Sequence, residues 1–379
     1  MSDVYEQSVE LHKKFRGKLS ISSKVKLETK EDLSLAYTPG VARVCEEIAK
    51  DKSLAKQLTF KGNSVAVVTD GSAILGLGNL GPEAAMPVME GKAILFKEFG
   101  GVDAVPICLD TQDTEEIIKA VKLIAPTFGG INLEDISAPR CFEIEERLKK
   151  ELDIPVMHDD QHGTATVVLA ALINSLKLKN ASKESIRVVV NGAGAAGVAV
   201  TELLLEYGIK NITVCDSKGI ISKSRTDLNN TKKKLAEITN LENREGELGD
   251  AMKQADVFIG VSVKNAVTKD MVSSMNHHPI IFALANPIPE IMPDVAKEAG
   301  AFIVATGRSD FPNQINNVLA FPGIFRGALD NNVTEITNTM LVRAAENLAA
   351  HVADLSPENI LPQALDKTVA AVVAAAIKN

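Results

Sequence analysis

The sequence predicts an α/β protein with two domains, and three observations support this prediction. Short apolar runs alternate with amphipathic stretches along most of the 379 residues, a pattern typical of parallel sheets covered by helices. A glycine-rich turn joins one of these runs to a helix-like stretch in the second half. The length is sufficient for two hydrophobic cores. We therefore expect an N-terminal α/β domain and a C-terminal Rossmann-type domain with a doubly wound parallel sheet.

The composition excludes several classes of protein. With 45% hydrophobic and 24% charged residues, the chain resembles an ordinary globular protein. A net charge of -8 argues against a nucleic-acid partner, which requires a basic surface. The N-terminus lacks the apolar segment of a signal peptide, and no apolar run reaches the roughly 18 residues that span a membrane. We expect a cytoplasmic protein with no membrane contact, whose four scattered cysteines are reduced and mostly buried.

The first half of the chain predicts one parallel sheet. Four apolar runs are expected to be strands, namely SVAVVTD (64–70), DAVPICLD (103–110), GINLEDI (130–136) and IPVMHDD (154–160). Between them, residues 113–125 and 138–152 have helical periodicity. This alternation defines a first domain over residues 1–160, and a long apolar helix is expected to begin near Gly163.

The second half repeats the alternation after a polar link at 177–185. The expected elements are strands within 186–190, 211–216, 255–263, 278–287 and 301–307, with a helix over 195–208. Two further helices, over 337–352 and 364–377, are expected to pack back across the domain junction. We assign residues 161–379 to a nucleotide-binding domain with these C-terminal helices.

Two segments match the G-x-G-x-x-G pattern, and their contexts differ. GAGAAG follows a strand and opens a helix, so its backbone N–H groups can bind a pyrophosphate. The residues predicted to bind a dinucleotide there are Gly192, Ala193, Gly194, Ala195, Ala196 and Gly197. GLGNLG (76–81) is followed by Pro82 and has no such strand and helix around it. We interpret it as a tight loop that lines the substrate cleft.

The next strand ends in Asp216, where an acid can bind the hydroxyl groups of a ribose. A carboxylate at this point would repel the 2′-phosphate of NADP, which favours NAD. Lys218, Lys223 and Arg225 follow closely and could soften the repulsion. NAD is therefore the expected cofactor, with NADP as the alternative.

The segment HDDQHG (158–163) leaves three interpretations open. A zinc site on His158 and His162 would need both on one helix, and no third nitrogen or sulfur ligand is evident. An oxygen site could form from Glu134, Asp135 and Asp160, because the ends of neighbouring parallel strands meet at one edge of the sheet. Clustered carboxylates of this kind favour Mg²⁺ or Mn²⁺. Spacing alone leaves a helix cap at Asp160 with two solvated acids equally open.

The two adjacent acids, Glu134 and Asp135, constrain the local backbone. They cannot both point to one side of a regular strand. At least one of them must lie where the strand gives way to a loop.

Three blocks together resemble the malic enzyme family. They are SLAYTPGVA (34–42), EGKAILFKEFGGVDAVPICLD (90–110), and NLEDI paired with HDDQHGTA. The resemblance extends from about residue 16 through ANPIPE to INNVLAFPGIFRGALD. The length is similar to that of the short microbial members, without room for a phosphotransacetylase-like extension, and a single activity is expected.

This resemblance implies a function and a set of site residues. Members oxidise L-malate with NAD(P)⁺ and release pyruvate and CO₂, using Mg²⁺ or Mn²⁺, and they can decarboxylate oxaloacetate. Their metal ligands match Glu134, Asp135 and Asp160, and Asp159 and the histidines would then be supporting residues. Their general acid matches Tyr37. Their general base matches Lys92, which would have to be neutral, with a lowered pKa, to accept the proton of the malate hydroxyl.

Further implications concern the substrate and the assembly. Asn286 and Asn317 match positions that contact the nicotinamide side and the substrate carboxylate. Larger members carry a carboxylate-binding arginine where this chain has Ser72 and Ala73, so loop amides, Asn286 or Asn317 would have to replace it. At least a homodimer is expected, and Tyr37 could serve its own cleft or that of a neighbour.

Two rival functions remain at this point. A simple 2-hydroxyacid or amino-acid dehydrogenase would need no divalent cation. A non-catalytic NAD(P)-binding regulatory protein would bind the dinucleotide and release no CO₂ from malate.

Overall fold

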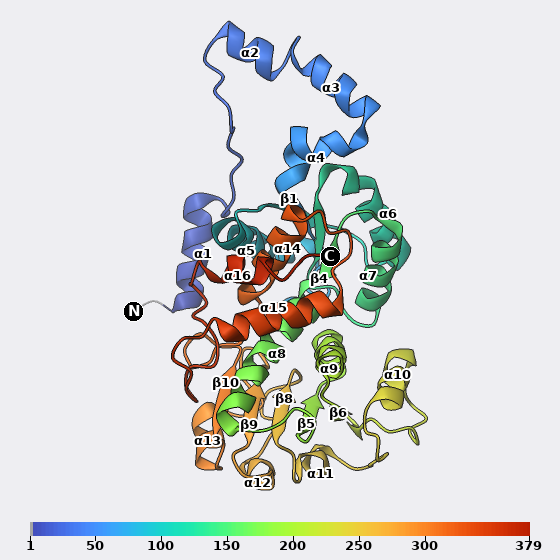
Figure 1. The fold of residues 1–379 in the computed structure, drawn as a ribbon, viewed down its shortest axis with the longest axis vertical. Coiled ribbons are helices and arrows are strands. Elements are labelled where there is room, and N and C mark those ends of the chain that lie inside the picture. Colours follow the sequence, from blue (N-terminus) through green and yellow to red (C-terminus); the bar gives the residue numbers. More distant parts are fainter. Residues whose placement is uncertain (1–2) are drawn as a thin grey trace.

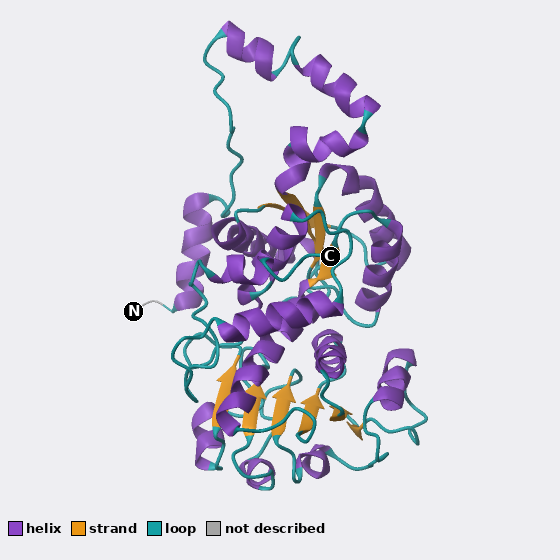
Figure 2. Cartoon of the chain, viewed as in Figure 1, coloured by secondary structure: helices purple, strands orange, loops and turns teal. Residues whose placement is uncertain are grey.

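The first domain is built on a four-stranded parallel sheet. The computed structural model describes residues 3–379 and places two α/β domains one above the other (Figures 1 and 2). The first sheet has the order β2-β1-β3-β4 and consists of β1 (Ser64–Thr69), β2 (Asp103–Cys108), β3 (Gly130–Leu133) and β4 (Val156–His158). Helices α5 (Pro82–Gly100), α6 (Thr114–Ile124) and α7 (Arg140–Glu151) accompany it. All six residues of β1 are buried, because the central strand of a parallel sheet has both faces covered.

The second sheet has six strands in the order β10-β9-β8-β5-β6-β7. Its strands are β5 (Arg187–Asn191), β6 (Asn211–Asp216), β7 (Gly219–Ile220), β8 (Val257–Gly260), β9 (Ile280–Ala283) and β10 (Ile303–Thr306). Its short helices are α9 (Ala195–Tyr207), α10 (Asn230–Ile238), α11 (Leu248–Met252), α12 (Lys269–Ser273) and α13 (Pro293–Glu298). The expected parallel order holds for five strands. The sixth, β7, was not predicted, and it pairs antiparallel to β6 as the return of a tight turn.

A long buried helix joins the domains, and the C-terminal helices cover the junction. This helix, α8 (Asp159–Lys179), leaves the end of β4 and contacts α9 and α15 (Asn338–Ala350). Helices α14 (Phe321–Asp330) and α16 (Val369–Ala374) pack against α5 of the first domain. Phe321 and Phe325 meet the ring of Phe96 edge-on, with centroids 4.7 and 5.4 Å away.

The first three helices of the chain lie at its surface. Helices α1 (Val4–Phe15), α2 (Lys30–Ala36) and α3 (Val41–Lys50) contain no buried residue. Helices α2 and α3, which we call the N-terminal arm (residues 30–50), project away from both domains (Figure 1). The short α4 (Ala55–Leu58) leads from the arm to β1.

Two details correct the sequence analysis. Helix α8 begins at Asp159 rather than near Gly163, since two aspartates in a first turn interact favourably with the helix dipole. The cysteines are free, but only Cys141 and Cys215 are buried, whereas Cys45 is exposed. Within residues 3–379, no helix combines the length and the apolar character needed to cross a bilayer.

Candidate active site

A cleft of about 470 Å³ lies between the two domains. The first domain contributes Ala73, Gly76 and Lys92 to its walls, and the second contributes Ser262 and Asn286. Gly76 belongs to the GLGNLG loop and has a φ of 74°, and a side chain there would come within 2.9 Å of the Asn286 carbonyl oxygen. The loop therefore lines the cleft, and glycine is needed where it approaches the second domain.

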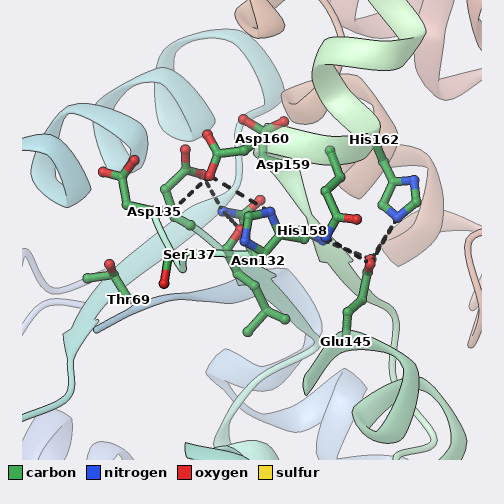
Figure 3. A network of polar contacts seen from close by, with 12 residues as sticks. Thr69, Asn132, Asp135, Ser137, Glu145, His158, Asp159, Asp160 and His162 are labelled. Atoms are coloured by element: carbon green, nitrogen blue, oxygen red, sulfur yellow. Dashed lines mark hydrogen bonds and ion pairs between the residues drawn. The ribbon is translucent and has the colours of Figure 1, made fainter. Parts of the chain in front are cut away.

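Three acids, Glu134, Asp135 and Asp160, line this cleft, and Figure 3 shows Asp135 and Asp160 side by side. Glu134 and Asp135 follow the last residue of β3, and Asp160 lies in the first turn of α8. One oxygen from each lies within 4.8 Å of the others. Asp135 has a φ of 53°, an uncommon value for a residue other than glycine, and this left-handed turn lets two adjacent acids face one point. Its N–H donates to Oδ2 of Asp160 at 2.8 Å.

The electrostatics of this acid cluster favour a bound cation. Burial, together with Asp160, raises the pKa of Asp135 to about 7. Burial likewise raises the pKa of Glu134 well above its ordinary value, although Lys92 opposes the shift. Oδ2 of Asp135 is buried without a hydrogen-bond partner. Three hard oxygen donors and an unpartnered buried carboxylate oxygen fit Mg²⁺ or Mn²⁺.

Lys92 lies beside the acid cluster on α5, with an exposed fraction of only 8%. Its Nζ donates to Oδ2 of Asp159 and lies 3.1 Å from Oε1 of Glu134. Oδ2 of Asp159 also accepts from Nδ2 of Asn317 at 2.7 Å. Asp159 therefore holds together the expected base and one of the two expected substrate-binding asparagines.

The contacts that Lys92 makes within the chain act against the expected lowering of its pKa. Burial lowers the pKa of Lys92, but Asp159 and Glu134 outweigh burial and raise it above its ordinary value. Desolvation and a cation were the two influences on this pKa that the sequence predicted. The direct contact of two buried carboxylates with the amine was not predicted. Positive charge added among the acids would act in the opposite direction.

Gly163 explains how Asp159 fits into the helix. A Cβ on Gly163 would collide with Oδ1 of Asp159. Only glycine therefore lets the aspartate fold back over the first turn of α8.

The two histidines do not form a zinc site. The His158 ring is fully buried, and neither of its nitrogens has a hydrogen-bond partner. The His162 ring instead contacts Glu145 of α7, with 3.0 Å between Nε2 and the carboxylate (Figure 3). Among residues 3–379, the acid cluster is the one group of side chains with metal-binding geometry.

Tyr37 lies far from this arrangement. It caps α2 in the N-terminal arm, where 65% of its surface is exposed. It does not line the cleft that contains Lys92. One chain therefore does not bring the expected general acid and general base together.

A second pocket of about 640 Å³ lies along the carboxyl ends of β5 and β6. Gly192, Ala193, Gly194 and Asp216 line it, and Ala196 lines the cleft instead. Ala195 is the first residue of α9, and Gly197 is buried where a Cβ would collide with the Gly192 carbonyl oxygen. Ser262 borders both pockets, so the two pockets adjoin at this residue.

The Asp216 carboxylate is held by two cations. Arg225 donates to both of its oxygens, at 2.8 and 3.1 Å, and Nζ of Lys232 donates to Oδ2 at 2.6 Å. Although burial raises the pKa of Asp216, these hydrogen bonds lower it to about 2. Of the basic residues expected here, Lys218 pairs its side chain with Asp227 instead. Lys232 was missed because it lies 16 residues further along the chain, on α10.

Other supporting residues were also missed. Glu290 is fully buried and accepts the N–H groups of Ser262 and Ala285, at 2.9 and 3.0 Å, which fixes the loops after β8 and β9. Arg140 binds Asp70 at 2.9 Å and donates to Ser72 at 3.1 Å, so it braces the loop that carries Ala73. The one signal for Glu290 was a glutamate next to the prolines of ANPIPE.

The fold and the cleft define a class, a two-domain α/β dehydrogenase with a Rossmann-type second domain. Two family models match this chain, "Malic enzyme, N-terminal domain" over residues 16–149 and "Malic enzyme, NAD binding domain" over residues 161–379. The chain belongs to the malic enzyme family.

Curated relatives and solved structures agree with this assignment. The chain is 58% identical over 375 residues to the bifunctional malic/malolactic enzyme of Bacillus subtilis, covering 98% of this chain and 92% of the relative. It is 57% identical to the NAD-dependent malic enzyme of Geobacillus stearothermophilus, covering 93% and 74%. The crystal structure of the NAD-dependent malic enzyme of Thermotoga maritima superposes with a TM-score of 0.96 at 50% identity, covering all of both chains.

Proposed function

We propose that this protein catalyses the oxidative decarboxylation of L-malate to pyruvate and CO₂ with reduction of NAD(P)⁺, and that it also decarboxylates oxaloacetate. One observation carries the proposal. Three acids whose oxygens lie within 4.8 Å of one another stand beside a buried lysine, in a cleft that adjoins the pocket lined by the glycine-rich turn and Asp216. We expect the enzyme to act in the cytoplasm.

Glu134, Asp135 and Asp160 are the residues that would hold Mg²⁺ or Mn²⁺. When bound, the cation would draw electron density from the C2 oxygen of malate, and the nicotinamide would accept the hydride from C2. The acids supply hard oxygen ligands from two separate segments. The chain itself then has to place the substrate and move two protons.

Lys92 is the proposed general base for the C2 hydroxyl. Asp159 and Phe321 fix its position, the latter with its ring centroid 4.4 Å from Nζ. Asn317 orients Asp159 from the other side. With Ala73 in place of an arginine, the GLGNLG loop, Asn286 and Asn317 are the groups on the cleft wall proposed to bind the substrate carboxylate.

Tyr37 of a second copy is the proposed acid that protonates C3 after CO₂ leaves. The arm that carries it buries none of its residues and exposes Leu35, Tyr37 and Leu33. Exposed apolar side chains on a projecting element are typical of a surface that another chain covers. In a symmetric dimer each arm would reach the other cleft. Lys92 then passes the proton it took from the C2 hydroxyl to the phenol, which balances the reaction.

NAD⁺ is the proposed preferred cofactor, with NADP⁺ accepted less well. Asp216 can bind the ribose hydroxyl groups, while Arg225 and Lys232 neutralise its charge. A neutralised carboxylate repels a 2′-phosphate less than a free one does.

The test is an assay with L-malate and Mn²⁺ that compares NAD⁺ with NADP⁺ and quantifies pyruvate and CO₂. We expect both products, loss of activity on chelation, and recovery with added Mn²⁺. A simple dehydrogenase would continue after chelation and release oxaloacetate. A regulatory protein would bind the dinucleotide without turnover.

A further inference from the structure

A buried glutamate outside the cleft holds the segment that carries Asp159 and Asp160. Glu145 lies on α7 with an exposed fraction of 5%, and it does not line the cleft. It belongs to none of the sequence motifs. Its contacts nevertheless fall on the HDDQH segment at the start of α8 (Figure 3).

The Glu145 carboxylate receives donors from both sides of the two aspartates. The backbone N–H of His158 donates to Oε1 at 3.0 Å, and Nε2 of His162 lies 3.0 Å from the carboxylate. Gln161 adds a longer contact at 3.4 Å, and Lys149 lies 2.9 Å away on the same helix as Glu145. A buried carboxylate is stable only when it is paired and hydrogen-bonded in this way.

These contacts fix the orientation of the first turn of α8. The backbone of His158 precedes the two aspartates, and the His162 ring follows them by less than one turn, so Glu145 holds the turn at both ends. The anion also stands next to the N-terminus of α8, where the helix dipole favours negative charge. The His158 ring makes no hydrogen bond to Glu145, and its Nδ1 lies 3.8 Å from Oδ2 of Asp160.

Orientation of this turn decides two contacts inside the cleft. Asp159 must point at Lys92, and Asp160 must meet the N–H of Asp135. A small rotation of the turn would move both carboxylates away from their partners. Residues that orient metal ligands in this way commonly change metal affinity by about 10- to 100-fold when they are replaced.

We propose that Glu145 is a positioning residue that acts through the His158 backbone and the His162 ring to set the affinity of the acid cluster for a divalent cation. The inference rests on the proposed function, because it takes Glu134, Asp135 and Asp160 as the cation site. It adds a residue that contacts neither substrate nor cation.

The test measures Mn²⁺ binding alone, by electron paramagnetic resonance of free Mn²⁺, in the full-length protein without malate or dinucleotide. We expect Glu145→Gln to weaken Mn²⁺ binding by roughly 10- to 100-fold. The matched control is Glu146→Gln, because Glu146 is the next residue, is exposed and pairs only with Lys150. This control should bind Mn²⁺ as the wild type does.

A second pair of variants keeps the test decisive if Glu145→Gln does not fold. His162→Leu removes one donor to Glu145 and should weaken Mn²⁺ binding. His162→Gln retains a donor and should restore most of the affinity. Recovery by the conservative variant would support positioning through Glu145.

Thermal unfolding of the metal-free variants separates positioning from a merely structural role. A lower melting temperature with unchanged Mn²⁺ affinity in Glu145→Gln and His162→Leu would overturn the inference and leave the proposed function intact. A wild-type protein that binds no Mn²⁺ would overturn the proposed cation site, and the inference with it.

Discussion

Lys92 and Tyr37, the two proposed proton-transfer residues, occupy opposite environments. Lys92 has an exposed fraction of 8% and contacts two buried carboxylates between the two domains. Tyr37 is 65% exposed and lies on an arm whose helices bury no residue. Under the proposed function, a single chain would supply the base and the cation site, and the acid would come from a second copy.

The cleft and the N-terminal arm also differ in the contacts that hold their residues in place. Residues in the cleft are fixed by the ends of buried strands and by hydrogen bonds from neighbouring helices. Helices α2 and α3 of the arm contain no buried residue, and under the proposed function contacts with a second copy would set the position of the arm. Variants of the cleft and of the arm should therefore fail in distinguishable ways.

The largest effect is expected for Lys92→Ala. Without the base, kcat for malate should fall by roughly 10²- to 10⁴-fold, because no other amine lines the cleft within the described chain. NAD⁺ affinity, measured by calorimetry, should stay close to wild type, since the dinucleotide pocket does not include Lys92. Lys97→Ala, on the exposed side of the same helix, is the control. Normal turnover in Lys92→Ala would remove the proposed base.

Mixing two inactive variants tests whether Tyr37 of one chain completes the cleft of another. Tyr37→Phe and Lys92→Ala should each be nearly inactive as pure dimers. If each cleft uses the tyrosine of its neighbour, dimers re-formed from an equal mixture should regain about a quarter of wild-type activity, because half of them carry one cleft with both residues intact.

Recovery of activity in the mixture and absence of recovery each test the proposal. The control is a mixture of Lys92→Ala with a double variant that lacks both residues, which should stay inactive. In a swapped dimer, the intact cleft receives its lysine from one chain and its tyrosine from the other. Absence of recovery after verified subunit exchange would place Tyr37 outside the cleft of its neighbour.

The fold could be predicted from the sequence because local patterns determine it, whereas the acid cluster needed the family resemblance as well, since spacing alone left a helix cap with two solvated acids equally open. Apolar runs that end in acids mark the ends of strands, and parallel strands bring those ends to one edge. The start of α8 was misplaced by four residues, since Asp159 and Asp160 resemble the end of a strand as much as the first turn of a helix. Glu145, Glu290 and Lys232 were missed for a different reason. Each of them has a partner that lies 13 to 28 residues away in the chain, and no local pattern marks such contacts.

The pKa of Lys92 could not be predicted from the lysine alone. Desolvation lowers this pKa, whereas the Asp159 and Glu134 carboxylates that contact the amine raise it. The position of Tyr37 shows a second limit. A motif identifies the residue, but it does not identify the chain whose cleft the residue completes.

A smaller effect is expected for the pH dependence of Mn²⁺ binding in the metal-free protein. The pKa of Asp135 is raised to about 7 and that of Asp159 to about 6, so protons compete with the cation below neutral pH. Mn²⁺ affinity should fall by up to about tenfold per pH unit below 7 and level off above it. Tyr37→Phe should give the same profile, because the arm takes no part in the acid cluster. A profile that is flat from about pH 5.5 to about pH 8 would contradict these pKa values.

The smallest effect is expected for a variant of the dinucleotide pocket, whose lining does not include the N-terminal arm. Asp216→Ala removes the carboxylate that Arg225 and Lys232 share, although Arg225 keeps its pair with Asp227. Both cations then become available to a 2′-phosphate, and charge-assisted contacts of this kind are strong. We expect the ratio of NADP⁺ to NAD⁺ affinity, measured by calorimetry, to rise by about tenfold. Asp227→Ala is the matched control, because Asp227 also contacts Arg225 but leaves the Asp216 pairs intact. Equal shifts in both variants, or an equal loss of both cofactors in Asp216→Ala, would show that Asp216 organises the pocket without choosing between the cofactors.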